Sequence, residues 1–112
     1  MKLTVKIKFW LEIEHHYVFG EGLFKLLSKI DELGTLRGAT KELGMSYRYA
    51  WGIIKKSEQR IGKPLLKTHK GWTHGKIGYG GAELTADAKL LIGKYLEAKN
   101  TLQKIDKSYE II

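Results

Sequence analysis

Hydrophobic and polar residues alternate along the start of the chain. Every second residue from residue 3 to residue 13 is hydrophobic: Leu3, Val5, Ile7, Phe9, Leu11 and Ile13. A period of two is typical of a half-buried β-strand, so the pattern predicts a strand over residues 3–13. A polar turn at residues 14–16 and a second strand over residues 17–19 would complete a hairpin. Trp10 interrupts the polar face, which indicates a partner or a covering segment at that position.

The spacing becomes helical after residue 22. Residues 22–33 carry a wide apolar stripe that ends at Gly34, which predicts a scaffold helix. Residues 35–62 then read as a short helix, a tight turn at Gly44 and a longer helix. Thr35 and Ser46 are suited to cap these two helices, because their side-chain oxygens accept from free backbone N–H groups.

The longer of these two helices has two distinct faces. Its expected buried stripe consists of Ala50, Ile53, Ile54 and Ile61. Its expected outer face consists of Tyr47, Arg48, Trp51 and Lys55. A flat, polar and cationic helix face of this kind is what the major groove of DNA accepts. Glu58 lies off that face, and we expect it to form a structural ion pair.

A glycine-rich segment follows Pro64, which ends helical structure. Short strands over residues 65–68 and 82–84 flank residues 71–81, where five of the thirteen glycines lie. This pattern predicts a wing, with Lys70, His74 and Lys76 placed to contact phosphate or the minor groove. The alternative is a surface loop without a partner.

The last segment, residues 86–109, has the pattern of a long helix capped by Thr85. Its hydrophobic positions follow an unbroken heptad spacing: Ala88, Leu91, Tyr95, Ala98, Leu102, Ile105, Tyr109 and Ile112. A small domain cannot bury that whole length, so a second copy is the expected partner. The predicted dimer interface comprises Leu91, Tyr95, Ala98, Leu102, Ile105 and Tyr109. The alternative is a monomeric core helix with a frayed end.

Size and composition place the chain among single-domain globular proteins. It has 112 residues, of which 43% are hydrophobic and 29% are charged. Residues 1–112 are therefore expected to form one domain: strands in 1–19, helices in 22–62, a wing in 63–85 and a terminal helix in 86–112. The absence of cysteine fits a reducing compartment, so we expect a cytoplasmic protein that does not enter a membrane.

The net charge of +8 is concentrated in one part of the sequence. Residues 35–81 contain ten Lys and Arg side chains and two acids, while bases and acids balance elsewhere. Such a concentration is typical of a surface that binds a polyanion. It favours nucleic acid as the partner.

These residues also carry a resemblance to a known family. The sequence GTLRGATKELGMSYRYAWGIIKKSEQRIGKPLL, followed by GGAELT, resembles the DNA-binding domain of LysR-type regulators. Within that superfamily it is most similar to the molybdate-responsive, ModE-type regulators, over about residues 10–91. The resemblance implies a mainly α fold with small β content (α+β): a winged helix-turn-helix with an N-terminal β-hairpin and a long C-terminal dimerisation helix.

The resemblance and the charge together predict a transcription regulator that binds specific double-stranded DNA as a homodimer. The residues expected to contact DNA are Arg37, Ser46, Tyr47, Arg48, Trp51, Lys55, Lys56, Lys70, His74 and Lys76. Arg48 is the expected base reader, because a guanidinium pairs bidentately with guanine. The alternative is an architectural protein that binds DNA without regard to sequence.

Other functional classes have weaker support in the sequence. His15 and His16 are adjacent and lack neighbours that would complete a metal-ligand set, so an exposed turn is expected there. No catalytic triad or nucleotide loop is recognisable, so we expect neither an enzyme nor a cofactor. The oxyanion-sensing module of larger ModE-type regulators is not present in these 112 residues, which leaves any small-molecule effector unknown.

Overall fold

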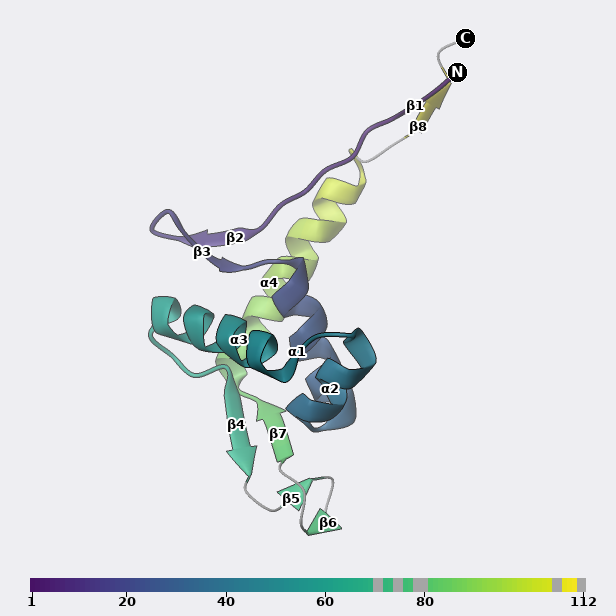
Figure 1. The fold of residues 1–112 in the computed structure, drawn as a ribbon. Coiled ribbons are helices and arrows are strands. Elements are labelled where there is room, and N and C mark those ends of the chain that lie inside the picture. The colour runs from purple at the N-terminus through teal and green to yellow at the C-terminus, as the bar shows by residue number, and fades with distance from the viewer. Residues whose placement is uncertain (70–71, 74–75, 78–80, 106–107, 111–112) are drawn as a thin grey trace.

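A computed structural model describes residues 1–69, 72–73, 76–77, 81–105 and 108–110. The helices in these ranges are α1 (Glu21–Leu33), α2 (Leu36–Leu43), α3 (Tyr47–Ile61) and α4 (Ala86–Gln103). The strands are β1 (Lys2–Thr4), β2 (Leu11–Ile13), β3 (His16–Phe19), β4 (Leu66–His69), β5 (Trp72–Thr73), β6 (Lys76–Ile77), β7 (Gly81–Leu84) and β8 (Ser108–Glu110). The molecule is elongated, with extents of 61 × 31 × 22 Å, and β1 and β8 lie together at one end (Figure 1).

The predicted helix caps are confirmed. The side chains of Thr35, Ser46 and Thr85 each accept a hydrogen bond from a backbone N–H in the first turn of the following helix, at 3.0–3.2 Å. At the other ends, Gly34, Gly44 and Gly62 have φ between 68° and 80°. Glycine adopts this left-handed conformation without steric cost, so the ends of α1, α2 and α3 are fixed by local chemistry.

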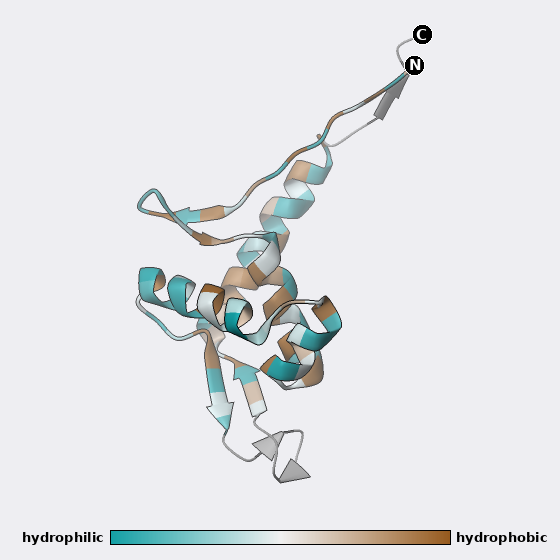
Figure 2. Ribbon diagram, viewed as in Figure 1, coloured by the Kyte–Doolittle hydropathy of each residue, from teal (hydrophilic) through white to brown (hydrophobic). Residues whose placement is uncertain are grey.

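The hydrophobic core surrounds α1. Its fully buried residues include Leu26, Leu27 and Ile30 of α1 and Ile54 of α3, each with an exposed fraction of 0%. The apolar faces of α2, β3, β7 and α4 complete the same cluster. Figure 2 shows hydrophobic colour where the helices meet and hydrophilic colour on the outer turns of α3. The core therefore fixes α3 and α4 on two sides of α1.

The strands of the described residues form four separate antiparallel pairs: β1–β8, β2–β3, β4–β7 and β5–β6. The expected continuous strand over residues 3–13 is wrong, because only its two ends have pairing partners. β1 pairs with β8, while β2 pairs with β3 through a turn in which Glu14 and His15 have positive φ. The predicted turn and the predicted strands flanking the glycine-rich segment are confirmed.

The last helix is shorter than predicted. α4 ends at Gln103, and residues 108–110 form β8 instead of continuing the helix. Helices gain most of their stability from packing, and Ile105, just beyond α4, is 55% exposed. The expected fold class, a mainly α winged helix-turn-helix with an N-terminal hairpin and a long dimerisation helix, is therefore corrected. The described chain is four helices with four two-stranded antiparallel pairs.

Glu58 joins α3 to the segment that enters β4. One carboxylate oxygen accepts from the backbone N–H of Leu65 at 2.7 Å, and the other lies 3.2 Å from the Lys55 ammonium. The Glu58 side chain is only 13% exposed. The expected structural ion pair is thus confirmed, with a backbone contact in addition.

Glu58→Ala is expected to lower the free energy of unfolding by about 1–3 kcal/mol, because it leaves the Leu65 N–H without its acceptor. Urea denaturation would measure the loss. Gln59→Ala is the matched control, since Gln59 is exposed on the same turn and is expected to change stability by less than about 0.5 kcal/mol. Equal effects of the two variants would contradict this role for Glu58.

Among the described residues, no helix is both long enough and apolar enough to cross a membrane.

Candidate functional site

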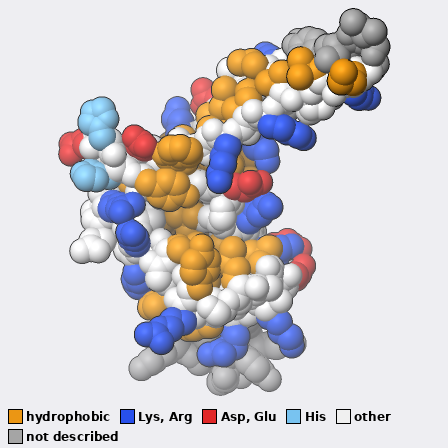
Figure 3. Space-filling view, turned by 45° about the horizontal axis from the view of Figure 1, so that its top comes forward, with side chains coloured by type: hydrophobic (Ala, Val, Ile, Leu, Met, Phe, Trp, Pro, Cys, Tyr) orange, Lys and Arg blue, Asp and Glu red, His pale blue; other side chains and the backbone are white. Residues whose placement is uncertain are grey.

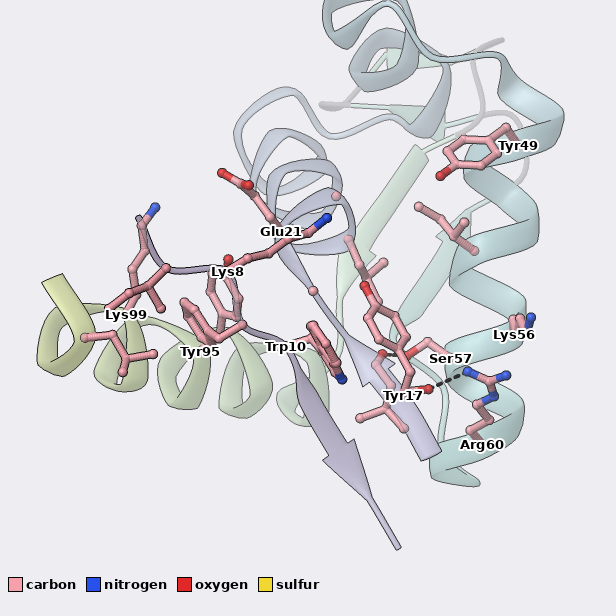
Figure 4. A pocket seen from close by; sticks show the side chains of 18 of the residues that line it. Lys8, Trp10, Tyr17, Glu21, Tyr49, Lys56, Ser57, Arg60, Tyr95 and Lys99 are labelled. Carbon is pink, nitrogen blue, oxygen red and sulfur yellow. Dashed lines mark hydrogen bonds between the residues drawn. The ribbon is translucent and has the colours of Figure 1, made fainter. Parts of the chain in front are cut away.

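A cavity of about 670 Å³ opens between the N-terminal segment, the start of α1, α3 and the second half of α4 (Figure 4). The hairpin strand β3 and the residues just before β2 form one side of it. The inner face of α3 lies against β3 and lines the same cavity, while the start of α1 and the second half of α4 complete its walls. Its walls therefore come from segments far apart in the sequence.

Two half-exposed aromatic rings lie at the centre of this cavity. Trp10 and Tyr17 are each 46% exposed, and their ring centroids are 6.3 Å apart at 38°. The Trp10 indole N–H donates to Glu12 at 2.7 Å, which fixes one edge of the ring. A Cβ at Gly20 would lie 2.0 Å from the Tyr17 hydroxyl, so glycine is needed at residue 20 for Tyr17 to occupy this position. Both side chains line the cavity.

Tyr95 forms the base of the cavity on the α4 side. Its ring stacks against Phe9 and Phe24 at centroid distances of 4.8 and 4.7 Å, and it meets Phe19 at 5.5 Å. Only 2% of Tyr95 is exposed. Its ring is therefore covered by its own chain, and no finding tests the predicted place of Tyr95 in an interface between two copies.

Positive charge outnumbers negative charge around the cavity. The cationic lining residues are Lys8, Lys56, Arg60 and Lys99, and the one acid among the lining residues is Glu21. Arg60 donates from Nη1 to the Tyr17 carbonyl oxygen at 2.6 Å, and Ser57 donates from Oγ to the Val18 carbonyl oxygen. These two bonds attach α3 to β3 and hold the cationic side of the cavity in place (Figure 4).

Two phenols of the cavity, those of Tyr17 and Tyr95, have a raised pKa and stay protonated at neutral pH. Burial raises the pKa of Tyr17 above its usual value, and the neighbouring Tyr49 adds to that shift. Burial also raises the pKa of Tyr95, with smaller contributions from Glu21 and Tyr17. A neutral phenol can donate a hydrogen bond, so the Tyr17 hydroxyl can act as a donor.

Four of the residues expected to contact DNA lie together on the outer surface. The Arg37 guanidinium lies 4.7 Å from the Tyr47 ring centroid, and the Lys55 ammonium lies 4.5 Å from that of Trp51. The Tyr47 and Trp51 rings are parallel within 8°, with centroids 6.5 Å apart. These residues form a row in which two neighbouring rings are flanked by a cation at each end, and none of them lines the cavity.

The other expected contact residues are dispersed. Ser46 uses its side-chain oxygen to cap α3, and Arg48 is exposed in the first turn of that helix. Lys56 is on the cavity side, not beside Lys55. Lys70 and His74 lie outside the described residues. Lys76 lies in β6.

The expected interface residues along α4 also differ in their surroundings. Leu91 and Ala98 are half-buried, and Leu102 lines the cavity. Ile105 lies beyond the end of α4, and Tyr109 pairs with Leu3 in the β1–β8 pair. No finding tests whether these residues or Tyr95 meet a second copy, and that role stays a prediction.

Reasoning from the sequence missed most of the cavity. Lys8, Arg60 and Lys99 carried no periodic signal that would bring them together, because they lie on three different segments. The available signal was Trp10, a large ring on the polar face of an alternating segment, which indicated a covering partner. Figure 3 shows hydrophobic side chains gathered between Lys and Arg side chains on one face of the molecule.

The described residues contain no group of three or more His, Asp or Glu side chains placed to hold a metal ion. The cavity instead offers ammonium, guanidinium and phenol donors. Such donors bind the oxygen atoms of an anion and do not coordinate a bare metal ion.

Comparison with curated proteins finds two molybdenum-pterin-binding proteins of Rhodobacter capsulatus. The chain is 32% identical to MopB over 85 residues, which cover 76% of this chain and 30% of MopB. It is 30% identical to MopA over 87 residues, which cover 75% of this chain and 33% of MopA. The chain thus spans about a third of the length of each relative. No protein-family model matches it.

These relatives correct the expected identity and function. Their names describe proteins that bind molybdenum-pterin, a small molecule, and describe neither a DNA-binding domain nor a regulator. The expectation of a ModE-type, LysR-like transcription regulator that binds double-stranded DNA is corrected on this finding, whereas the expected homodimer is not tested by it. The architectural alternative is unsupported for the same reason.

Proposed function

We propose that the chain binds a small anionic ligand of the molybdenum-pterin class in the cavity between β3, α1, α3 and α4. One observation carries the proposal: four cations and one acid surround a cavity whose centre holds two half-exposed aromatic rings. The names of the two relatives support the same ligand class. We further propose that the chain binds this ligand without catalysing a reaction. We also propose that the chain is located in the cytoplasm.

The size and walls of the cavity suit a planar ligand. Small-molecule sites commonly have volumes of about 300–1,000 Å³ and apolar walls with a few placed polar groups. A pterin is a flat heteroaromatic ring, and such rings stack on aromatic side chains. Trp10 and Tyr17 are the rings on which the pterin would stack, and the Tyr17 hydroxyl would supply a polar group beside them.

The charge of the cavity suits the anionic part of such a ligand. Lys8 and Lys99 lie toward the α4 side, while Lys56 and Arg60 lie along α3 (Figure 4). Cations on both sides attract an anion that enters between them, and low salt strengthens the attraction. These donors would bind oxygen atoms of the ligand. They would not coordinate its metal, which would stay bound within the ligand.

Lys8→Gln is expected to weaken binding of pterin-6-carboxylate by about three- to tenfold, because it removes one cation from a partly exposed site. Isothermal titration calorimetry at low ionic strength would measure the dissociation constant. Lys6→Gln is the matched control, since Lys6 is exposed two residues earlier and does not line the cavity. Absence of binding by the unmodified protein, or equal losses in the two variants, would overturn the proposal.

A further inference from the structure

Two cations lie one helical turn apart on the cavity face of α3. Lys56 and Arg60 are at positions i and i+4, which places their side chains on the same side of the helix. Both line the cavity, and both are exposed. Ser57, one position after Lys56, is buried and bonded to the Val18 carbonyl oxygen. The helix face that carries the two cations is therefore held against β3.

Arg60 is oriented before any ligand arrives. Its Nη1 donates to the Tyr17 carbonyl oxygen at 2.6 Å. A guanidinium has five N–H donors in a planar fork, so one bond leaves four donors for other acceptors. A fixed guanidinium loses less conformational freedom on binding than a mobile one, which favours tight binding. The Tyr17 carbonyl is thus the positioning group for Arg60.

We propose that Lys56 and Arg60 form a phosphate subsite at the α3 side of the cavity, so that the preferred ligand carries a phosphate monoester. This inference rests on the proposed function and specifies its ligand further. The phosphate oxygens accept from the Arg60 fork and the Lys56 ammonium, while the ring of the same ligand stacks at Trp10 and Tyr17.

A phosphate monoester fits this pair better than a carboxylate does. It carries about −1.5 to −2 charges at neutral pH and three acceptor oxygens, which match two adjacent cations. The planar Arg60 fork can engage two of those oxygens together. Glu21, the acid among the lining residues, lies across the cavity on α1 and does not occupy the space beside the pair (Figure 4).

Calorimetric titration with neopterin and with its 3′-phosphate ester tests the subsite. The ester is expected to bind about 10- to 100-fold more tightly than neopterin, because it adds charge-assisted hydrogen bonds. Lys56→Gln and Arg60→Lys are each expected to reduce that preference, the ratio of the two dissociation constants, by about tenfold. Arg60→Lys keeps the positive charge and removes the planar guanidinium. A loss of preference for the ester in this variant therefore reports the geometry of the guanidinium and not its charge.

Controls separate the possible outcomes. Lys55→Gln is the matched control on α3, since Lys55 lies over Trp51 and not in the cavity, and it is expected to keep the full preference for the ester. Circular dichroism melting would verify that Arg60→Lys remains folded at the titration temperature.

Equal binding of neopterin and its ester would overturn the phosphate subsite and leave the proposed function standing. Binding of neither compound would overturn the proposed function itself. Inorganic phosphate serves as a third probe. If it bound as tightly as the ester, the site would be a free-phosphate site without a ring contribution, and the inference would be wrong.

Discussion

Tyr95→Ala is expected to lower the free energy of unfolding by about 3–5 kcal/mol, the range for deleting a large buried aromatic side chain. The ring is 2% exposed and stacks on both Phe9 and Phe24. Its removal would leave a void where the N-terminal segment, α1 and α4 meet. Chemical denaturation followed by circular dichroism would measure the loss.

Two controls make this prediction specific. Leu96→Ala, at the next position of α4, is expected to cost less than about 1 kcal/mol because Leu96 is 39% exposed. Tyr95→Phe is expected to cost less than about 1.5 kcal/mol, since it keeps the stacked ring. The loss in Tyr95→Ala should not depend on protein concentration, because Phe9, Phe19 and Phe24 belong to the same chain. A loss that vanished on dilution would contradict this assignment.

Trp10→Ala is expected to weaken pterin-6-carboxylate binding by about 10- to 100-fold, because stacking of a heteroaromatic ring on an aromatic side chain contributes roughly 1–3 kcal/mol. The stability of the variant should change little, since Trp10 is 46% exposed and its contacts are with Glu12 and Tyr17. Fluorescence of the bound pterin or calorimetry would measure the affinity.

Tyr47→Ala is the matched control for Trp10→Ala. Tyr47 is a ring of similar exposure, 42%, on the outer face of α3 and away from the cavity. Its removal is expected to leave pterin affinity within about twofold of the original value. If Tyr47→Ala weakened binding and Trp10→Ala did not, the ligand would be bound at the outer face and the cavity assignment would be wrong.

Features set by local chemistry were predictable from the sequence. Thr35, Ser46 and Thr85 cap helices because a short side-chain oxygen reaches N–H groups three residues ahead. Gly34, Gly44 and Gly62 end helices because glycine tolerates positive φ. Both effects involve neighbouring residues, so the starts of α2, α3 and α4 and the ends of α1, α2 and α3 follow from the printed sequence.

Features that depend on distant pairing were not predictable. The pairing of Lys2–Thr4 with Ser108–Glu110 joins the two ends of the chain, and no local pattern specifies it. The heptad spacing of α4 identified Tyr95 as a hydrophobic position. It did not distinguish packing on Phe9 and Phe24 of the same chain from packing on a second copy, because both require the same residue type.

The charge distribution explains why the residues predicted to contact DNA and the residues that line the cavity are largely different. The cations are concentrated in residues 35–81 of the sequence. The fold, however, places their side chains on two different surfaces. Arg37 and Lys55 lie over rings on the outer row, whereas Lys56 and Arg60 line the cavity. Adjacent residues such as Lys55 and Lys56 point about 100° apart on a helix, so one basic run can serve two faces.

Nuclear magnetic resonance of the ¹⁵N-labelled protein during titration with pterin-6-carboxylate tests the central claim most directly. The chain has three tryptophans, whose indole N–H groups give separate reporters. We predict that the Trp10 indole signal and the backbone signals of Tyr17 and Arg60 shift together and saturate, while the Trp51 indole signal stays in place. A shift at Trp51 without one at Trp10, or no saturable shift, would contradict the account.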